Sequence, residues 1–149
     1  LYEESIRIPM IYRWPGGLSP REVDTQVTSL VDVMPTALSL AAVDIPESVQ
    51  GTDVSEVVLG VKQATGENAA FIETTTAQVG MRTLTHLYGV KKAMESDRTT
   101  TVIDDRFMFF DLVRDPLQTN NLAASSDSDP TASSLRERLL EWDRETKWL

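Results

Sequence analysis

Residues 29–51 read SLVDVMPTALSLAAVDIPESVQG, and this stretch decides the fold expected for the chain. Apolar residues recur in it at helical spacing, which predicts an amphipathic helix with one buried stripe. The stripe consists of Leu30, Met34, Ala37, Leu38 and Ala41. Asp32 is placed to cap the first turn, and Pro35 lies inside that turn, where its missing N–H removes no helical hydrogen bond. Pro46 and Gly51 are expected to end the helix and turn the chain.

Two strands are expected before this helix. Ile6 to Ile11 alternates imperfectly between apolar and polar residues, and Pro9 places such a strand near a sheet edge, because proline donates no ladder hydrogen bond. Asp24 to Val31 has the second strand pattern. The N-terminal half therefore predicts strands and helices of one α/β layer.

The C-terminal half has a different pattern, with short β-type runs and no helix between them. The expected strands are Ala70–Thr75, Val79–Thr83, Leu87–Ala93 and one within Val102–Leu112, with a turn at Glu95–Arg98. Strands this close in sequence favour an antiparallel meander.

A final helix is expected to lie across one face of this sheet. Its apolar residues recur at helical spacing from Leu135 to about Trp148, and Ser133 or Ser134 is the expected cap. The preceding Ser125–Pro130 is low in complexity and is expected to be mobile.

Composition limits the classes of function. The chain has 149 residues, 41% of them apolar and 25% charged, which is typical of a globular domain. A formal net charge of -9 disfavours nucleic acid and anionic membrane surfaces as partners. No apolar run reaches the length of a membrane helix, and the lack of Cys excludes disulfides, thiolate metal sites and a thiol nucleophile within these residues.

Three segments together carry a resemblance to a known family. They are Tyr2–Gly16 (with YEESIRIP and WPG), Ser29–Gly51, and Phe110–Ala123 (with FDL, DP and NLA). In this order and spacing they resemble the type I sulfatase family of the alkaline-phosphatase-like superfamily, in the part that follows the catalytic half. The resemblance implies an α/β fold and, in a full-length parent, hydrolysis of sulfate esters.

The resemblance transfers no catalytic residue to this chain. The family's nucleophile is a formylglycine made within a Cys/Ser-x-Pro-x-Arg motif, and neither Ser19-Pro20-Arg21 nor any other Ser has that spacing. Its divalent cation, usually calcium, is held by an Asp-Asp pair and by an Asp-His/Asn-Gly element. That element and a substrate-contacting Lys lie just before the part that matches Tyr2–Ser5. We therefore assign no catalytic, cofactor-binding or metal-binding residue here.

Three sets of residues could be taken for site residues. His86 is the only imidazole, and we expect a surface or turn position, with the rim of the parent's substrate pocket as its one functional role. Asp104-Asp105 could be mistaken for the metal-binding pair, but a solvated turn is expected. Glu3-Glu4 is expected to seat the segment after the Lys rather than to act as a carboxylate dyad.

The sequence thus predicts an α/β chain (α+β if it is considered as a fragment) cut from a longer sulfatase-like hydrolase. Residues 1–67 would be the terminal strands and helices of the large α/β domain. Residues 68–149 would be a C-terminal subdomain, a four-stranded antiparallel sheet packed against a C-terminal helix. The expected partner is the missing N-terminal catalytic part, and the exposed strand Ile6–Trp14 could support self-association. Alone, the chain is expected to be inactive.

Two alternatives stay open. A phosphonate or phosphate monoester hydrolase of the same superfamily would share much of the sequence of these segments, and residues before Leu1 would distinguish it. A non-catalytic module that binds a partner through an apolar face is the other, although the segment around Ile6–Trp14 would then need neighbours for its backbone.

Overall fold

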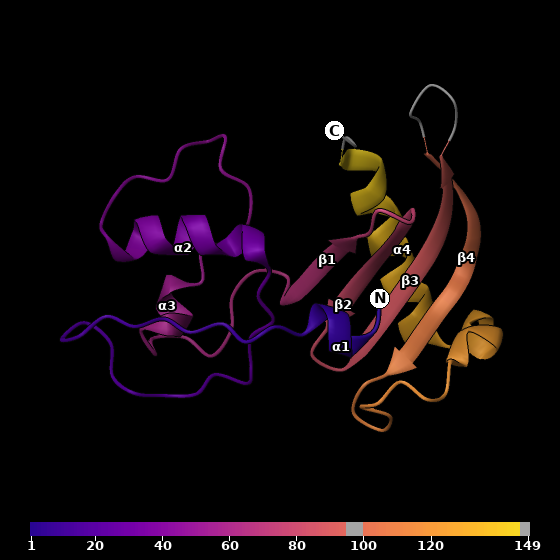
Figure 1. Cartoon of the computed structure of the whole chain (residues 1–149), viewed down its shortest axis with the longest axis horizontal. Coiled ribbons are helices and arrows are strands. Elements are labelled where there is room, and N and C mark those ends of the chain that lie inside the picture. The colour runs from indigo at the N-terminus through magenta and orange to yellow at the C-terminus, as the bar shows by residue number, and fades with distance from the viewer. Residues whose placement is uncertain (95–99, 147–149) are drawn as a thin grey trace. The chain divides into compact units, whose positions relative to one another are not determined.

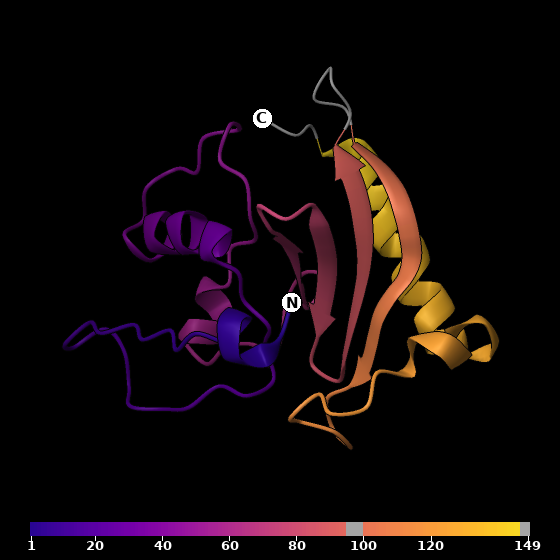
Figure 2. The ribbon, with the colours of Figure 1, turned by 45° about the vertical axis from the view of Figure 1, so that its right-hand side comes forward.

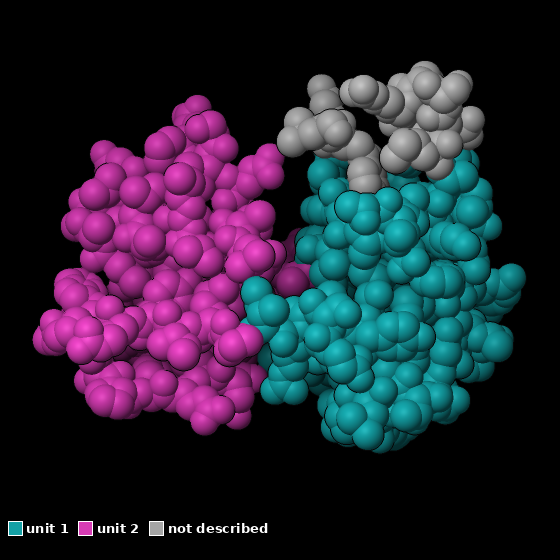
Figure 3. All heavy atoms as spheres, in the orientation of Figure 1, with its two compact units in different colours: residues 1–8, 71–149 teal, residues 9–70 magenta. Residues whose placement is uncertain are grey.

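The computed structural model describes residues 1–94 and 100–146, and the chain divides into two compact units. One unit combines Leu1–Ile8 with residues 71–149, and the other is Pro9–Ala70 (Figure 3). Each unit is described by itself. The first eight residues are thus grouped with the sheet, although they are separated from it in sequence by the whole second unit.

The first unit is built on one four-stranded sheet of order β1-β2-β3-β4 (Figure 1). Its strands are β1 (Ala69–Glu73), β2 (Gln78–Thr83), β3 (His86–Met94) and β4 (Thr100–Asp111). β2 pairs with β3, and β3 with β4, both antiparallel, and the second pairing has register shifts around Lys91. The meander predicted from the closely spaced strands is confirmed.

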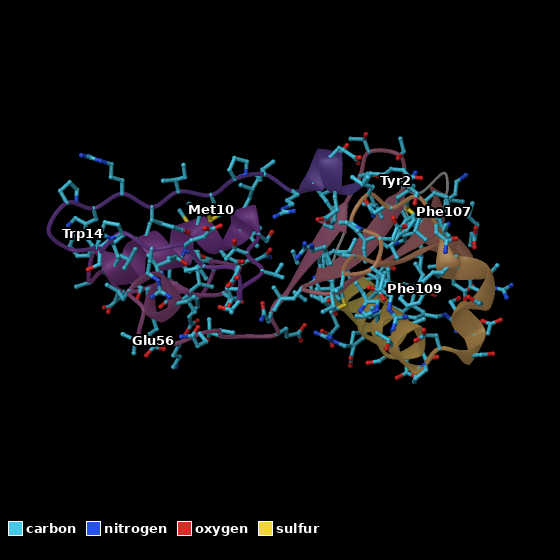
Figure 4. The ribbon with its side chains drawn as sticks, turned by 90° about the horizontal axis from the view of Figure 1, so that it is seen from below. Tyr2, Met10, Trp14, Glu56, Phe107 and Phe109 are labelled. Carbon is cyan, nitrogen blue, oxygen red and sulfur yellow. The ribbon has the colours of Figure 1, made fainter. Side chains whose placement is uncertain are left out.

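The two faces of this sheet have different covers (Figures 1 and 2). The helix α4 (Pro130–Glu145) runs along one face, where Leu135 and Leu139 are buried. The short helix α1 (Glu3–Ile6) lies on the other. Figure 4 shows Phe109 on the side of α4 and Tyr2 on the side of α1. The predicted C-terminal helix across one face of the sheet is confirmed.

α4 begins earlier than its apolar spacing suggested. Asp129, not Ser133 or Ser134, caps it by accepting hydrogen bonds from the backbone N–H groups of Thr131 (2.7 Å) and Ala132 (3.2 Å). Pro130 takes the first helical position, where no N–H is needed. The Asp-Pro pair is therefore the stronger start signal.

The stretch Ser125–Pro130 lies mostly in a 3-10 helix, and its mobility stays a prediction. η2 spans Leu122–Ser128, with Ser126 buried. The turn expected at Glu95–Arg98 and the helix end expected at Trp148 lie outside the described residues.

The second unit contains η1 (Leu30–Asp32), α2 (Val33–Leu40) and α3 (Ser55–Val58), and none of its residues 9–68 forms a strand. The strands predicted at Ile6–Ile11 and Asp24–Val31 are therefore wrong. A strand needs a neighbour to pair its N–H and C=O groups, and the sheet formed by the described residues contains only β1 to β4. Because Ile6–Trp14 is not a strand, self-association through its edge loses its basis.

α2 is amphipathic, but the predicted direction of its apolar stripe is wrong. Leu30, which lies in η1, is 67% exposed and Met34 is 60% exposed, and Ala37 and Ala41 are exposed too. Among the five predicted residues, Leu38 is the half-buried one. The face turned inward carries Asp32, Pro35 and Thr36, which are all buried. No described helix is long and apolar enough to cross a membrane.

Hydrogen bonds from side chains to backbone hold the second unit together. Asp32 accepts from the N–H groups of Ser29 and Thr52, both at 2.7 Å, and Thr36 Oγ1 accepts from Val54 N–H at 3.0 Å. Four further bonds tie its N-terminal stretch to its C-terminal stretch. Thr25 Oγ1 donates to the Gln63 carbonyl, and Thr65 N–H donates to Gln26 Oε1. Val27 N–H donates to Asn68 Oδ1, and Asn68 Nδ2 donates to the Thr25 carbonyl. We call these hydrogen bonds between side chains and backbone polar latches. They connect parts of a unit that buries few large apolar side chains.

Candidate functional site: the seat of the N-terminal segment

The N-terminal segment, Leu1–Ile8, lies directly on the sheet because two glycines make room for it. Gly80 of β2 and Gly89 of β3 are paired across the strands. A Cβ added at Gly80 would lie 2.8 Å from Leu1 Cδ1, and one at Gly89 would lie 2.9 Å from the same atom. Both distances are shorter than normal contacts, so the first residue is seated where neighbouring strands carry no side chain.

Charge-assisted hydrogen bonds fix the next turn of the segment. Arg82 of β2 donates from Nε to Glu3 Oε1 (3.2 Å) and from Nη2 to Glu3 Oε2 (3.1 Å). The Arg82 side chain is 21% exposed and the Glu3 side chain 12%, so the pair is largely shielded from water. This two-point geometry sets the direction as well as the position of α1.

A second anchor comes from the loop after β4. The Glu3 backbone N–H donates to Gln118 Oε1 at 2.5 Å. Gln118 is 6% exposed and has a φ of 53°, a left-handed conformation that few side chains adopt. Tyr2 stacks at a tilt on Phe110, with ring centroids 6.0 Å apart. The segments around Tyr2 and Phe110 that carried the family resemblance are thus in contact.

The loop that presents Gln118 is itself braced by carboxylates. Asp115 accepts hydrogen bonds from the N–H groups of Asn120 (2.8 Å) and Thr119 (3.1 Å), and these bonds lower the pKa of Asp115. Asp111 accepts from the Arg114 and Val113 N–H groups, and these bonds, Arg114 first, lower the pKa of Asp111 as well. Gln118 is therefore presented by a stiffened turn.

His86 is the first residue of β3 and lies opposite Asp111. Its ring stacks on Phe109 at 5.6 Å between centroids, and its Nδ1 is 2.8 Å from Thr85 Oγ1. The imidazole also contributes to the lowered pKa of Asp111. A role for His86 at a substrate pocket stays a prediction.

The other two sets of residues have structural contacts. Glu3 contacts Arg82 and Gln118, whereas its neighbour Glu4 is exposed. The solvated turn predicted for Asp104-Asp105 is wrong, because both residues lie within β4. The Asp105 carboxylate pairs with Arg136 of α4, so this residue links strand and helix.

Cofactor chemistry does not fit these residues. Among residues 1–94 and 100–146, no group of three or more His, Cys, Asp or Glu side chains could hold a metal ion. Neither a cysteine nor a Ser-x-Pro-x-Arg motif is present to supply a formylglycine. Arg82 and Gln118 instead bind the N-terminal segment at Glu3.

The residues that contact the N-terminal segment, which we call its seat, could not be predicted from the sequence. Arg82 and Glu3 are 79 positions apart, and no local pattern pairs them. Only the β2–β3 register places Gly80 and Gly89 opposite each other, and no local sequence pattern predicts this pairing. Gln118 gave no signal, because a single polar residue in a loop does not reveal its burial.

Comparison with known proteins shows which family this chain resembles. Residues 1–145 match the family model described as N-sulphoglucosamine sulphohydrolase, C-terminal. The ulvan-active sulfatase of Formosa agariphila is 27% identical over 139 residues, which cover 93% of this chain and 27% of that protein. The endo-4-O-sulfatase of Bacteroides thetaiotaomicron is 31% identical over 150 residues, covering 91% and 29%.

A solved structure agrees with these sequence matches. The crystal structure of yidJ, a Bacteroides fragilis protein assigned as a sulfatase, superposes with a TM-score of 0.64 at 27% identity and covers 87% of this chain and 27% of that one. The chain spans between a quarter and a third of the length of each of these relatives. The predicted resemblance to the C-terminal portion of sulfatases is confirmed.

Proposed function

The chain belongs to the family of sulfatase C-terminal regions, and from that membership we propose that it is the C-terminal part of a sulfuric ester hydrolase. In this proposal, its task is to position the end of the catalytic part rather than to perform chemistry. The observation that carries the proposal is the seat of Leu1–Ile8, because both the sheet and Gln118 contact this segment.

The seat lies next to where the resemblance places catalytic groups. In the family, the Asp-His/Asn-Gly metal element and the substrate-contacting Lys come just before the part that matches Tyr2–Ser5. Backbone held at Glu3 restricts the positions available to the residues before it. A displacement of about 1 Å at a reacting group can lower a rate by about 100-fold, so a fixed segment there would matter for turnover.

The cofactors belong to the upstream part in this proposal. A divalent cation, with calcium the expected ion, would hold the sulfuryl oxygens, and a formylglycine would be the nucleophile. Since the described residues offer no ligand set for either, we propose that the 149-residue chain alone has no sulfatase activity.

The test is sulfate-ester hydrolysis by the protein encoded by the complete gene, alongside the 149-residue chain alone. We expect the complete protein to release sulfate from an aryl sulfate ester and the chain alone to release none. Release of phosphate from the matching phosphate ester, without sulfate release, would favour the phosphate monoester hydrolase instead. Turnover by the chain alone would contradict the positioning role.

A substitution at Arg82 tests the positioning role itself. In the complete protein, Arg82→Ala removes both hydrogen bonds to the Glu3 carboxylate, and we expect kcat to fall at least about tenfold while KM changes little. Arg114→Ala is the matched control, because Arg114 also pairs with a carboxylate of this unit but its side chain is 88% exposed. Equal kcat values for the two variants would contradict the role of the seat.

A further inference from the structure

The ammonium group of Lys92, on β3, is buried against the last turn of α4. The Lys92 side chain is 2% exposed, and its Nζ lies 2.5 Å from Oδ1 of Asp143, a residue whose side chain is 11% exposed. A lysine is rarely buried this deeply unless it is paired, because its charge loses hydration. This ion pair therefore joins β3 to the C-terminal end of α4 where little water reaches it.

A second carboxyl group, that of Glu73, lies on the same side of the sheet. Phe71 of β1 stacks on Trp142 of α4, with ring centroids 4.7 Å apart and ring planes 6° from parallel. Since residues two apart on a strand share a face, Glu73 also points toward α4. The charges of Lys92 and Asp143 both act on the Glu73 carboxyl group. We call Glu73, Lys92 and Asp143 the Lys92 cluster, and it brings together β1, β3 and α4.

The charges of the Lys92 cluster do not balance, because two carboxyl groups share one ammonium group. Partial burial raises the pKa of Glu73 most, Lys92 opposes this rise, and Asp143 adds to it. β2 lies between β1 and β3, but its charged residue, Arg82, pairs with Glu3 instead.

The other charged residues of β3 and of the end of α4 do not titrate inside this cluster. Arg138, one turn before Trp142, is half-buried, and its guanidinium stays charged at every pH considered. The remaining charged residues are exposed, namely Lys91, Glu141, Arg144 and Glu145. Glu73 is therefore the carboxyl group whose protonation changes the balance of charge under α4.

We propose that the Lys92 cluster is a pH-sensitive attachment of the end of α4 to the sheet, which is stronger at mildly acidic pH than at neutral pH. When Glu73 is ionised, its carboxylate competes with Asp143 for the Lys92 ammonium group and repels the Asp143 carboxylate. When Glu73 takes up a proton, Lys92 and Asp143 form a neutral pair without a competitor.

The sign of this effect follows from proton linkage. With α4 attached, burial and the Asp143 carboxylate hold the pKa of Glu73 above its usual value, although Lys92 opposes them. The attached state therefore binds the proton of Glu73 more tightly than a state in which the last turn of α4 has moved away. The resulting stabilisation is present at acidic pH and is lost as pH rises through the raised pKa. The lowered pKa of Asp115 has the opposite sign.

Hydrogen exchange at a single amide at the end of α4 provides the test. The N–H of Thr146 donates to the Trp142 carbonyl at 2.9 Å, so its exchange reports opening of the last turn. Exchange is followed by NMR in the 149-residue chain and divided by the intrinsic rate at each pH. We expect the protection factor to be at least about threefold higher at about pH 5 than at about pH 7.

Three variants separate Glu73 from the other carboxyl groups. Glu73→Gln removes the competing charge, so protection at Thr146 should be high and nearly equal at both pH values. Glu141→Gln, at an exposed residue of α4, is the matched control and should keep the pH dependence of the parent chain. Asp143→Asn should lower protection at both pH values, because Lys92 loses its partner on α4.

The proposal is overturned if protection at Thr146 in the parent chain is unchanged or falls on acidification. It is also overturned if Glu73→Gln keeps the pH dependence of the parent chain, since another group would then be responsible. Protection in Asp143→Asn equal to that of the parent chain would show that the ion pair does not attach α4. If Asp143→Asn does not fold, the comparison of Glu73→Gln with Glu141→Gln still decides.

Discussion

The two units of this chain are stabilised by different interactions. The sheet unit buries apolar side chains on both faces of its sheet, with Leu87 on one face and Tyr88 and Phe109 on the other at most 1% exposed. The unit of residues 9–70 buries few large apolar side chains and relies on carboxylate, hydroxyl and amide groups that bind backbone. The contrast indicates that the sheet unit contains its own folding determinants, while the other unit leaves apolar side chains such as Leu30 and Met34 exposed.

The largest expected effect separates a core leucine from a stripe leucine. Leu87→Ala in the 149-residue chain should lower the free energy of unfolding by about 2–5 kcal/mol, because it leaves a cavity where the side chain is 0% exposed. Leu30→Ala, at a residue 67% exposed, should change it by less than about 0.5 kcal/mol. Urea denaturation followed by circular dichroism measures both. Similar losses would mean that the stripe is already buried in the chain alone.

An intermediate effect is expected at a polar latch of the second unit. Asp32→Ala removes the acceptor of two backbone N–H groups, those of Ser29 and Thr52, and should cost about 1–3 kcal/mol. Hydrogen exchange at these two amides should accelerate, while exchange in β3 stays as it was. Asp44→Ala, at an exposed residue of the same unit, is the control. Unchanged exchange at Thr52 would show that the latch does not hold the unit.

The same contrast explains which sequence predictions succeeded. The strands of the meander were predictable because each contains a short apolar run that is buried within the sheet unit, as at Leu87 and Phe110. The final helix was predictable for the same reason. The start of this helix was predicted too late, because its apolar spacing begins only at Leu135, whereas the capping pair Asp129-Pro130 starts the helix earlier.

In the second unit, periodicity predicted the helix but not which of its faces is buried. The spacing of Leu30 and Met34 marks an apolar face, and the usual rule assigns that face to the interior of the same domain. That rule fails here, because Leu30 and Met34 are both mostly exposed. The seat of the N-terminal segment was equally unreadable, since Arg82, Gln118 and Glu3 meet only through the tertiary fold.

The smallest effect is expected in the loop after β4, where side chains of the sheet unit also accept hydrogen bonds from backbone N–H groups. Asp115 accepts from the N–H groups of Asn120 and Thr119, and these bonds hold the pKa of Asp115 below its usual value of about 3.9. A folded-state pKa below the unfolded one adds stability above the unfolded pKa and loses it as pH falls through the folded pKa. Asp115→Asn should therefore lower Tm slightly at pH 7, and the difference from the parent chain should shrink below about pH 4. Glu137→Gln, at an exposed residue of α4, should show no such convergence. A Tm difference at Asp115 that stays constant down to low pH would contradict this prediction, because the charge of the carboxylate would then contribute nothing to stability. The hydrogen-bonding geometry of the side chain alone would explain the difference.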